Sequence, residues 1–281
     1  MTPPTLLTGG TGTLGRLVVP LLRDAGFTVR VLSRSSHEPA AGVEFVTGDL
    51  ATGNGVEAAA NGVETIVHCA GTQKGDDVKA RNLVQAAARS GRPHIVYVSV
   101  VGADKVPVVS GVDRAMFGYF AAKRAAEGIV GDSGLPWTTL RATQFHDLTL
   151  MTVQGMAKMP VIPVPSGFKF QPVDAGEVAA RLVELALGTP SGHVPDIGGP
   201  RVYEMAELVR SYLRATGKHR LIMPMRLPGK AARAFRDGAN LAPQRAVGRR
   251  TWEHFLAERL RTDTDPVRSA TTHPSQTAAK R

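Results

Sequence analysis

The sequence is poor in cysteine and has no long hydrophobic run. Its single cysteine, Cys69, excludes an internal disulfide and a cysteine-based metal cluster. No uninterrupted apolar stretch approaches the roughly 20 residues that a membrane span requires, so we expect no membrane span. The first residues, MTPPTLLTGG, lack the basic start and the apolar run of a signal peptide. We therefore expect a cytoplasmic enzyme or binding protein.

Negative charge is scarce in the last part of the chain. The 281 residues carry 34 Lys+Arg and 24 Asp+Glu, a formal net charge of +10. Residues 1–200 are balanced at 17 of each sign, whereas residues 201–281 hold 17 Lys+Arg against 7 Asp+Glu. An anionic substrate, a nucleic acid or a membrane surface would suit this excess, and so would a solvated helical face with a basic tail, which we favour. Because aromatic interleaving and a nucleic-acid motif are absent, we expect no nucleic-acid partner.

Short apolar runs alternate with helix-patterned segments along the chain. The expected strands are 5–10, 28–33, 43–48, 65–71, 94–100 and 137–143. The expected helices lie near 13–25, 53–60, 76–90, 113–131, 174–187 and 203–216. Strands rich in Val and Ile, each followed by a helix, indicate a parallel sheet covered on both faces. With right-handed crossovers, the fold class is α/β, a doubly wound parallel sheet of Rossmann type.

The later part of the chain predicts a small C-terminal substrate lobe. The apolar patches MPVIPVP and GHVPDIGG indicate a further strand and part of this lobe. We expect one domain over residues 1–262, with the lobe formed mainly by about 145–172 and 190–262. Residues 263–281 are polar and without period, which predicts a disordered basic tail.

A glycine-rich segment, TGGTGTLGR, lies directly after the first expected strand. Gly9, Gly12 and Gly15 stand three residues apart and precede an amphipathic helix. In dinucleotide-binding folds such glycines permit a tight turn, let the backbone approach a pyrophosphate and let the helix pack on the strand. Free N–H groups of the helix terminus then face the phosphates. A glycine-rich turn with no ligand is the alternative. The other loop residues expected to contact the cofactor are Thr11, Thr13 and Leu14.

The end of the second expected strand bears on the choice between NAD and NADP. An acidic residue about 20 positions after the glycines would bind the ribose 2′-hydroxyl of NAD. Arg34 stands there instead, nineteen residues after Gly15, and no carboxylate follows before Glu38. A guanidinium suits a phosphate, so we expect NADP rather than NAD. The alternative is that Arg34 is a solvated loop residue and that Arg30, along the strand, takes this role or no residue does.

A tyrosine and a lysine stand four residues apart in YFAAKRAAE, a segment of strong helix formers. Residues at that spacing share a helix face. The unperturbed pKa of tyrosine is about 10, and a nearby cation lowers it. We therefore expect Lys123 to lower the pKa of Tyr119 and to prepare it for proton transfer. The alternative is two surface neighbours on a helix.

Several short motifs occur in an order known from one family. They are TGGTGTLG, LSR, GDL, CAG, VYVSVVGAD, YFAAK and GLPWTTLRATQF. In this order they resemble the atypical short-chain dehydrogenases/reductases, and FQPVDAGEVAARLVELAL is similar to their NmrA-like, NAD(P)-binding branch. The resemblance covers roughly residues 5–200 well and residues 200–262 more thinly.

The resemblance implies a cofactor surface at the ends of the strands. Asp49 would contact the adenine, with Leu50 beside it. Ala70 and Gly71 would lie against the adenosine ribose after the fourth strand. Lys123 would hold the nicotinamide ribose.

The resemblance also implies a catalytic set. Tyr119 would be the acid/base, and Ser99 would donate a hydrogen bond to the substrate oxygen. Gln144 and Phe145, in RATQF, would border the nicotinamide and the substrate pocket. The family asparagine has no clear counterpart, and Asn82, the nearest one, is expected to have a surface or packing role.

Other conspicuous residues are expected to be structural. His68 and Cys69 lie inside a strand pattern and suit the core, and Trp252 suits an anchor of a C-terminal helix. His146 fits either a loop or a substrate contact. The histidines show no metal spacing, so we expect no metal.

Together these features predict an NADPH-dependent oxidoreductase that reduces a small carbonyl, quinone or similar acceptor. Two alternatives stay open: a non-catalytic NADP-binding redox-sensing regulator, and an enzyme like a sugar-nucleotide epimerase or dehydratase. The basic C-terminal lobe would suit the diphosphate of the latter. Neither the acceptor nor the oligomeric state follows from the sequence.

Overall fold

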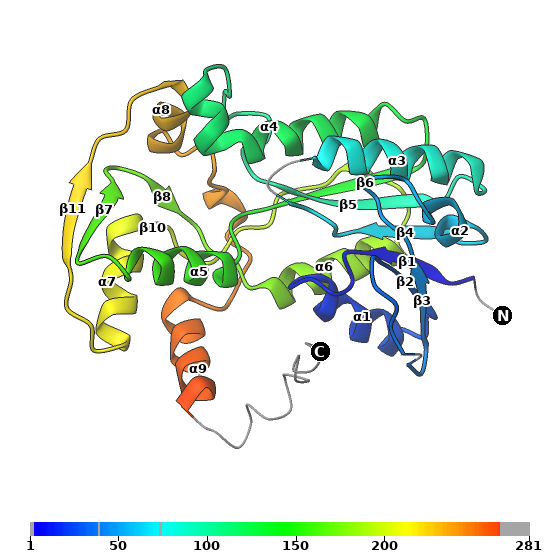
Figure 1. Ribbon diagram of the computed structural model, residues 1–281, viewed down its shortest axis with the longest axis horizontal. Helices are drawn as coiled ribbons and strands as arrows, with labels where there is room; N and C mark the ends of the chain where they lie inside the picture. The colour runs from blue at the N-terminus through cyan, green and yellow to red at the C-terminus, as the bar shows by residue number, and fades with distance from the viewer. Residues whose placement is uncertain (1–2, 39, 73–74, 265–281) are drawn as a thin grey trace, which may run out of the picture.

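A computed structural model of the chain describes residues 3–38, 40–72 and 75–264 (Figure 1). Its main body is a seven-stranded sheet in the order β3-β2-β1-β4-β5-β6-β9, in which every neighbouring pair is parallel. The strands are β1 (Thr5–Thr8), β2 (Val29–Ser33), β3 (Val43–Thr47), β4 (Thr65–His68), β5 (His94–Val100), β6 (Trp137–Ala142) and β9 (Gly192–His193). Apart from β9 at the edge, this is the strand order of a Rossmann-type doubly wound sheet. The predicted fold class is confirmed.

Helices cover both faces of this sheet (Figure 1). α1 (Gly15–Asp24) and α6 (Ala175–Leu187) pack on one face, and α2 (Val56–Ala60), α3 (Asp76–Arg89) and α4 (Gly111–Gly131) pack on the other. Each face has its own cluster of buried aliphatic side chains. The central strands are mostly apolar, as suits strands buried on both faces, and every residue of β5 is buried, including its polar His94 and Ser99.

A smaller lobe lies beside the sheet, at the left in Figure 1. It contains two small sheets, in which β8 (Lys169–Phe170) pairs antiparallel with β10 (Tyr203–Glu204) and β7 (Val161–Pro165) pairs parallel with β11 (Leu221–Met225). Trp252 is fully buried and packs with Phe255 and Leu256 against α7 (Met205–Ala215), which confirms its expected anchoring role. The elements after β6, besides α6 and β9, are α5 (His146–Met156), β7 (Val161–Pro165), β8 (Lys169–Phe170), β10 (Tyr203–Glu204), α7 (Met205–Ala215), β11 (Leu221–Met225), α8 (Lys230–Arg236), a 3-10 turn (Pro243–Arg245) and α9 (Trp252–Thr264).

The structure departs from the sequence-based expectation in the later part of the chain. Residues Gly192–His193, which we placed in the lobe, pair with β6 as the edge strand of the main sheet. The expected tail began at residue 263, but residues 263–264 continue α9, and 265–281 lie outside the described residues. Within the described part of the chain, no helix combines the length and apolarity needed to cross a membrane.

Candidate functional site

The glycine-rich turn between β1 and α1 is compact and leaves one side open. Gly9 has φ +72°, and a Cβ there would lie 2.7 Å from the backbone nitrogen of Ala70, at the end of β4. Gly12 N donates to Gly9 O at 3.0 Å and closes the turn. A Cβ on Gly12 would meet only Gly9 O, at 3.2 Å, whereas one on Gly15 would run into the backbone of Gly9. No side chain caps the first turn of α1. Arg16 N and Leu17 N already donate to Gly12 O and Leu14 O, so the N–H groups available to an anion are those just before them, at Leu14 and Gly15.

A cavity of about 390 Å³ opens at the carboxyl ends of β1, β2 and β4, in the size range of about 300–1,000 Å³ usual for small-molecule sites. It lies where the strand order reverses between β1 and β4, the usual place for a ligand in such sheets. The predicted cofactor residues that line it are Gly9, Thr11, Gly12, Arg34, Asp49, Leu50, Ala70 and Gly71. Thr13, Leu14 and Gly15 do not line it: Leu14 is the N-cap and Gly15 the first residue of α1, and Thr13 lies in the turn before them.

The two arginines considered as ligands of the NADP 2′-phosphate have different surroundings. Arg30 forms an ion pair with Glu44 at 2.9 Å and donates to two backbone carbonyls, so its guanidinium is engaged in the fold. Arg34 lines the cavity and has no hydrogen bond or ion pair with any described residue. His37, which the sequence analysis did not single out, also lines the cavity and hydrogen-bonds Ser33 at 2.8 Å. In the sequence, only its position three residues after Arg34 indicates that His37 could reach the cavity.

The loop after β3 is fixed from α3. Asn82 Nδ2 donates to the carbonyl oxygens of Leu50 and Ala51, at 2.7 and 3.3 Å. Asp49 Oδ1 accepts from Ala51 N at 2.9 Å, which tightens the same turn. Asn82 therefore has the packing role expected of it, and it supports two residues of the cavity wall.

Lys123 is buried behind the cavity wall at Gly71 and does not itself line the cavity. A Cβ on Gly71 would come within 3.0 Å of its Nζ. Lys123 Nζ donates to Tyr97 Oη and to Val98 O, each at 3.2 Å, and lies 3.2 Å from Asp76 Oδ2. Burial alone would lower the pKa of this ammonium, but the phenol of Tyr97 and the carboxylate of Asp76 raise it above its ordinary value.

Asp76 was not found by the sequence analysis, although it is only 1% exposed. Its Oδ1 accepts from Thr72 N at 2.8 Å and lies 3.4 Å from Lys79 Nζ, while its Oδ2 faces Lys123. A carboxylate in the first turn of a helix is ordinary in sequence. The contact with Lys123 spans 47 positions of the chain, and no local pattern indicates it.

The prediction that Lys123 lowers the pKa of Tyr119 is wrong. Burial raises the pKa of the Tyr119 phenol, and the Asp76 charge raises it further. Lys123 Nζ lies 5.8 Å from the Tyr119 ring, but its charge is opposed by the adjacent Asp76 carboxylate. Tyr97 is the phenol that Lys123 contacts directly, and burial nevertheless raises the pKa of Tyr97 to about 12.

The remaining predicted catalytic residues lie where the main sheet meets the lobe. Ser99, near the end of β5, is buried, and its Oγ has no hydrogen-bond partner in the part of the chain that the structure describes. Among the described residues, no hydrogen bond joins it to Tyr119, whose ring packs against a phenylalanine-rich cluster between α4 and α8. Gln144 Nε2 donates to Asn240 O at 3.5 Å. Phe145 precedes α5 and packs on the core of the main sheet. None of these four residues lines the cavity.

Three residues prove to be structural. His68 is 1% exposed and hydrogen-bonds Thr8 Oγ1 through Nδ1 at 2.6 Å. Cys69 reaches the cavity wall, but burial raises the pKa of its thiol to about 12, so it offers no thiolate nucleophile. His146 begins α5, is fully buried and stacks on Phe255, which excludes both the loop role and the substrate contact considered for it.

Comparison with known proteins gives consistent findings over most of the chain. A family model described as NAD(P)H-binding matches residues 9–186. The chain is 29% identical over 218 residues to a (4-alkanoyl-5-oxo-2,5-dihydrofuran-3-yl)methyl phosphate reductase of Streptomyces griseus, covering 76% of this chain and 74% of that protein. It is 31% identical over 244 residues to a ceramide reductase of Caulobacter vibrioides, covering 79% and 73%.

Among solved structures, an NADPH-dependent quinone oxidoreductase from Escherichia coli, complexed with NADPH, superposes with a TM-score of 0.76. The match covers 91% of this chain and 99% of that one, at 18% sequence identity. At this identity the likeness shows a shared fold.

Proposed function

Since the chain belongs to the NAD(P)H-binding family of atypical short-chain dehydrogenases/reductases, we propose that it is an NADPH-dependent oxidoreductase that reduces a small carbonyl, quinone or similar acceptor. The observation that carries the proposal is the cavity at the carboxyl edge of the sheet, which joins an open glycine turn to the unpaired Arg34. The relatives named above are reductases of different substrates, so the acceptor is proposed only as a class.

The residues of the cavity suit NADPH. The uncapped start of α1 and the open side of Gly12 would receive the pyrophosphate. Arg34 would bind the 2′-phosphate, because a guanidinium without another partner is available to a phosphate. Lys123, beside Gly71, would hold the nicotinamide ribose.

When bound, NADPH supplies a hydride to the acceptor, and the residues of the chain supply position and a proton. Ser99 Oγ, buried and unpartnered, would donate a hydrogen bond to the acceptor oxygen. Tyr119 would then donate a proton to that oxygen. The raised pKa of its phenol keeps the proton on Tyr119 at neutral pH, which suits an acid in the direction of reduction.

A screen of acceptors tests the proposal. Quinones, aldehydes, ketones and azo compounds would be supplied with NADPH, and the loss of NADPH absorbance would be followed. We expect at least one class to be reduced by the native protein and not by Gly12→Val, whose added side chain would block the cofactor. No reduction of any class, together with tight NADPH binding, would contradict the enzymatic part of the proposal.

One observation favours a second candidate, a non-catalytic NADP-binding regulator. Lys123 is paired with Asp76, and Tyr119 has no hydrogen bond to Lys123 or to Ser99. A regulator would bind NADPH in the same cavity and consume none in the screen. Its Tyr119→Phe variant would bind NADPH like the native protein, with no turnover to lose.

A further inference from the structure

The outer face of the β7–β11 sheet is apolar and uncovered. The register pairs Val161 with Leu221, Pro163 with Met223 and Pro165 with Met225, so these six side chains form two rows. The alternating residues Ile162, Val164 and Ile222 point the other way, into the core against α7. On the outer side Leu221 is 67% exposed, Met223 45% and Val161 39%. We call these two rows the β7–β11 face, which lies at the left margin of Figure 1.

The edges of this sheet are unsuited to pairing with a further strand. Leu221 N donates to Pro160 O, and Ser166 N donates to Met225 O. The odd residues of β11 therefore turn their N–H groups toward β7, and the even residues of β7 turn theirs toward β11. At the two free edges, the N–H groups would come from the odd residues of β7 and the even residues of β11. Among these positions Pro163, Pro165 and Pro224 have no N–H group to donate to a further strand. Addition of a strand from a second copy is disfavoured at both edges.

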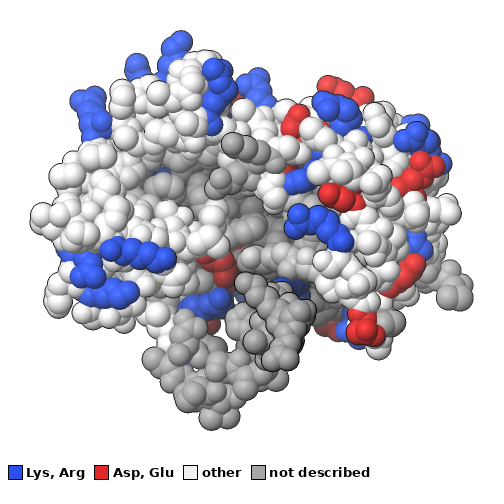
Figure 2. Space-filling model, viewed as in Figure 1, with Lys and Arg blue, Asp and Glu red and all other residues white. Residues whose placement is uncertain are grey.

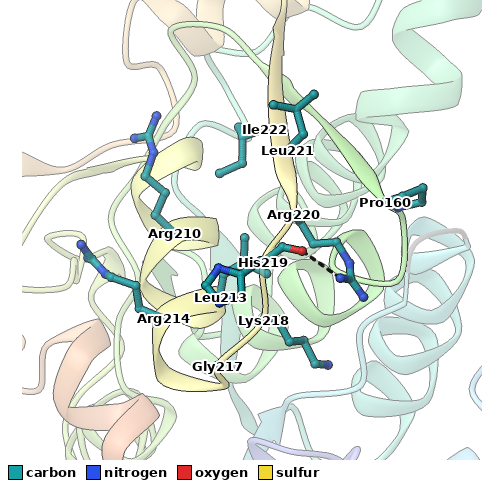
Figure 3. Close-up of a pocket in the computed structure, with 10 residues that line it drawn as sticks. All are labelled: Pro160, Arg210, Leu213, Arg214, Gly217, Lys218, His219, Arg220, Leu221 and Ile222. Atoms are coloured by element: carbon teal, nitrogen blue, oxygen red, sulfur yellow. Dashed lines mark hydrogen bonds between the residues drawn. The ribbon is translucent and has the colours of Figure 1, made fainter.

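Positive charge surrounds the β7–β11 face. The segments that contain its strands, residues 156–173 and 208–236, hold ten Lys+Arg and no Asp or Glu. In Figure 2 the corresponding margin of the molecule shows blue atoms and no red ones. At one end an open pocket of about 1010 Å³ is lined by Arg210, Arg214, Lys218, Arg220 and Leu221 (Figure 3). None of these four cations forms an ion pair with a described carboxylate.

The cations of the pocket come from neighbouring elements. Arg210 and Arg214 project from α7, and Lys218 and Arg220 follow in the turn that leads to β11 (Figure 3). Arg220 donates to the backbone carbonyl of His219 at 2.8 Å, which leaves its charge unneutralised. The charges therefore lie directly beside Leu221, the most exposed residue of the apolar rows.

We propose that the β7–β11 face and its basic pocket bind the surface of an anionic lipid bilayer, without spanning it. Exposed apolar side chains enter the interface between headgroups and acyl chains, and flanking cations are attracted to anionic headgroups. A second copy of the chain would bring like charges together, and residues 265–281 are also net positive in sequence. A soluble polyanion would match the cations but would leave the apolar rows uncovered. This proposal is independent of the reaction that the cavity supports.

Co-sedimentation with vesicles tests the proposal on the full chain. The native protein should bind vesicles of phosphatidylcholine with phosphatidylglycerol, bind pure phosphatidylcholine far less, and be released by salt. Arg220→Gln should lower the partition coefficient about fivefold. Met223→Glu should lower it further, because it places a charge in the apolar rows. Leu187→Glu is the matched control, since Leu187 is 50% exposed at the end of α6, and it should bind like the native protein.

Three results would overturn the proposal. The first is no binding to the anionic vesicles, and the second is equal binding to both kinds of vesicle. The third is a native dimer, seen by light scattering, that Met223→Glu converts to a monomer, because a second copy would then cover the face. If Met223→Glu does not fold, Arg220→Gln decides alone: an unchanged partition coefficient in this variant also overturns the proposal.

Discussion

Lys123 connects the two parts of the proposed site. Its ammonium lies beside the cavity wall at Gly71 and also contacts the buried groups of β5 and α3. If it turns to a bound ribose, Asp76 keeps its bonds to Thr72 N and Lys79. The Asp76 carboxylate therefore has partners whether Lys123 faces it or faces the ribose, so Lys123 can turn without leaving a buried charge unpaired.

The role of Tyr119 as proton donor predicts a selective loss of activity. Tyr119→Phe removes one oxygen with little change in volume, so turnover should fall by about 10²–10⁴-fold while NADPH affinity stays close to native. Steady-state assays with an acceptor from the screen, beside a cofactor titration, measure the two quantities. Tyr212→Phe makes the same change on α7, in the lobe core, and should retain native turnover.

The pH profile tests the same assignment. Since burial and the Asp76 charge raise the pKa of Tyr119, the protonated, donating form persists through neutral pH. The rate of reduction should be level between about pH 6 and about pH 9, and should decline only at higher pH. A rate that falls within this interval would indicate a proton donor with a lowered pKa and would contradict the assignment.

His68 predicts a loss of stability in acid. Burial, aided by the Lys123 charge, lowers the pKa of His68 to about 3, whereas the pKa in the unfolded chain is about 6.5. The unfolded state therefore takes up the proton first, and stability falls as the pH drops below about 6.5. Between about pH 7 and pH 5.5 this group should remove about 1.3 kcal/mol from the free energy of unfolding.

Urea unfolding of His68→Gln at the two pH values measures this contribution. The variant should lose that part of the pH dependence, while His146 and His94, whose pKa values burial also lowers, retain theirs. His254→Gln, at an exposed position, should behave like the native protein. An unchanged pH dependence in His68→Gln would contradict the account.

At the scale of elements, α4 is the one whose placement matters most for the site. Glu127, one turn after Lys123, forms a bidentate pair with Arg141 of β6 at 2.9 and 2.7 Å. Arg141 also pairs with Asp104, in the segment after β5, at 2.9 Å. These bonds fix α4 against β5 and β6, and so fix the helix face that carries Tyr119 and Lys123.

The Glu127–Arg141 pair predicts a large effect on stability. The two side chains are 6% and 17% exposed, and the loss of one partner from a buried pair costs about 3–5 kcal/mol. Because Arg141 keeps its pair with Asp104, Glu127→Ala should lower the free energy of unfolding in urea by up to this amount. Glu184→Ala breaks the exposed pair with Arg181 and should cost less than about 1 kcal/mol. Equal losses in the two variants would show that the buried pair does not fix α4.

The sequence predicted the elements of the main sheet better than those of the lobe. Strands buried on both faces have runs of Val and Ile that need no distant partner to be recognised, as in β5. β11 was missed because LIMPM contains a proline and pairs with β7, some 60 positions earlier. α5 was missed because it begins after Phe145 with no side-chain cap. In the site, the glycine turn is local and was predicted, whereas the Asp76–Lys123 contact is not local and was missed.

At the scale of the whole molecule, the two parts of the chain differ in charge and in the surfaces they offer. The balanced first 200 residues build the sheet and the cavity, and the basic remainder builds most of the lobe. The ends of β5 and β6 meet the lobe near Ala239 and Asn240. A substrate placed there would lie between the two parts, so the lobe would determine which acceptor is reduced.

Titration of the native protein with NADPH and with NADH, followed by cofactor fluorescence, tests the central claim most directly. We expect NADPH to bind more tightly, Arg34→Asp to weaken NADPH binding and leave NADH binding level or improved, and Gly12→Val to lose both while its circular dichroism stays native. If Gly12→Val retains tight binding, the glycine turn is not the phosphate site. If the native protein binds neither cofactor, the cavity is not a dinucleotide site and the account is contradicted.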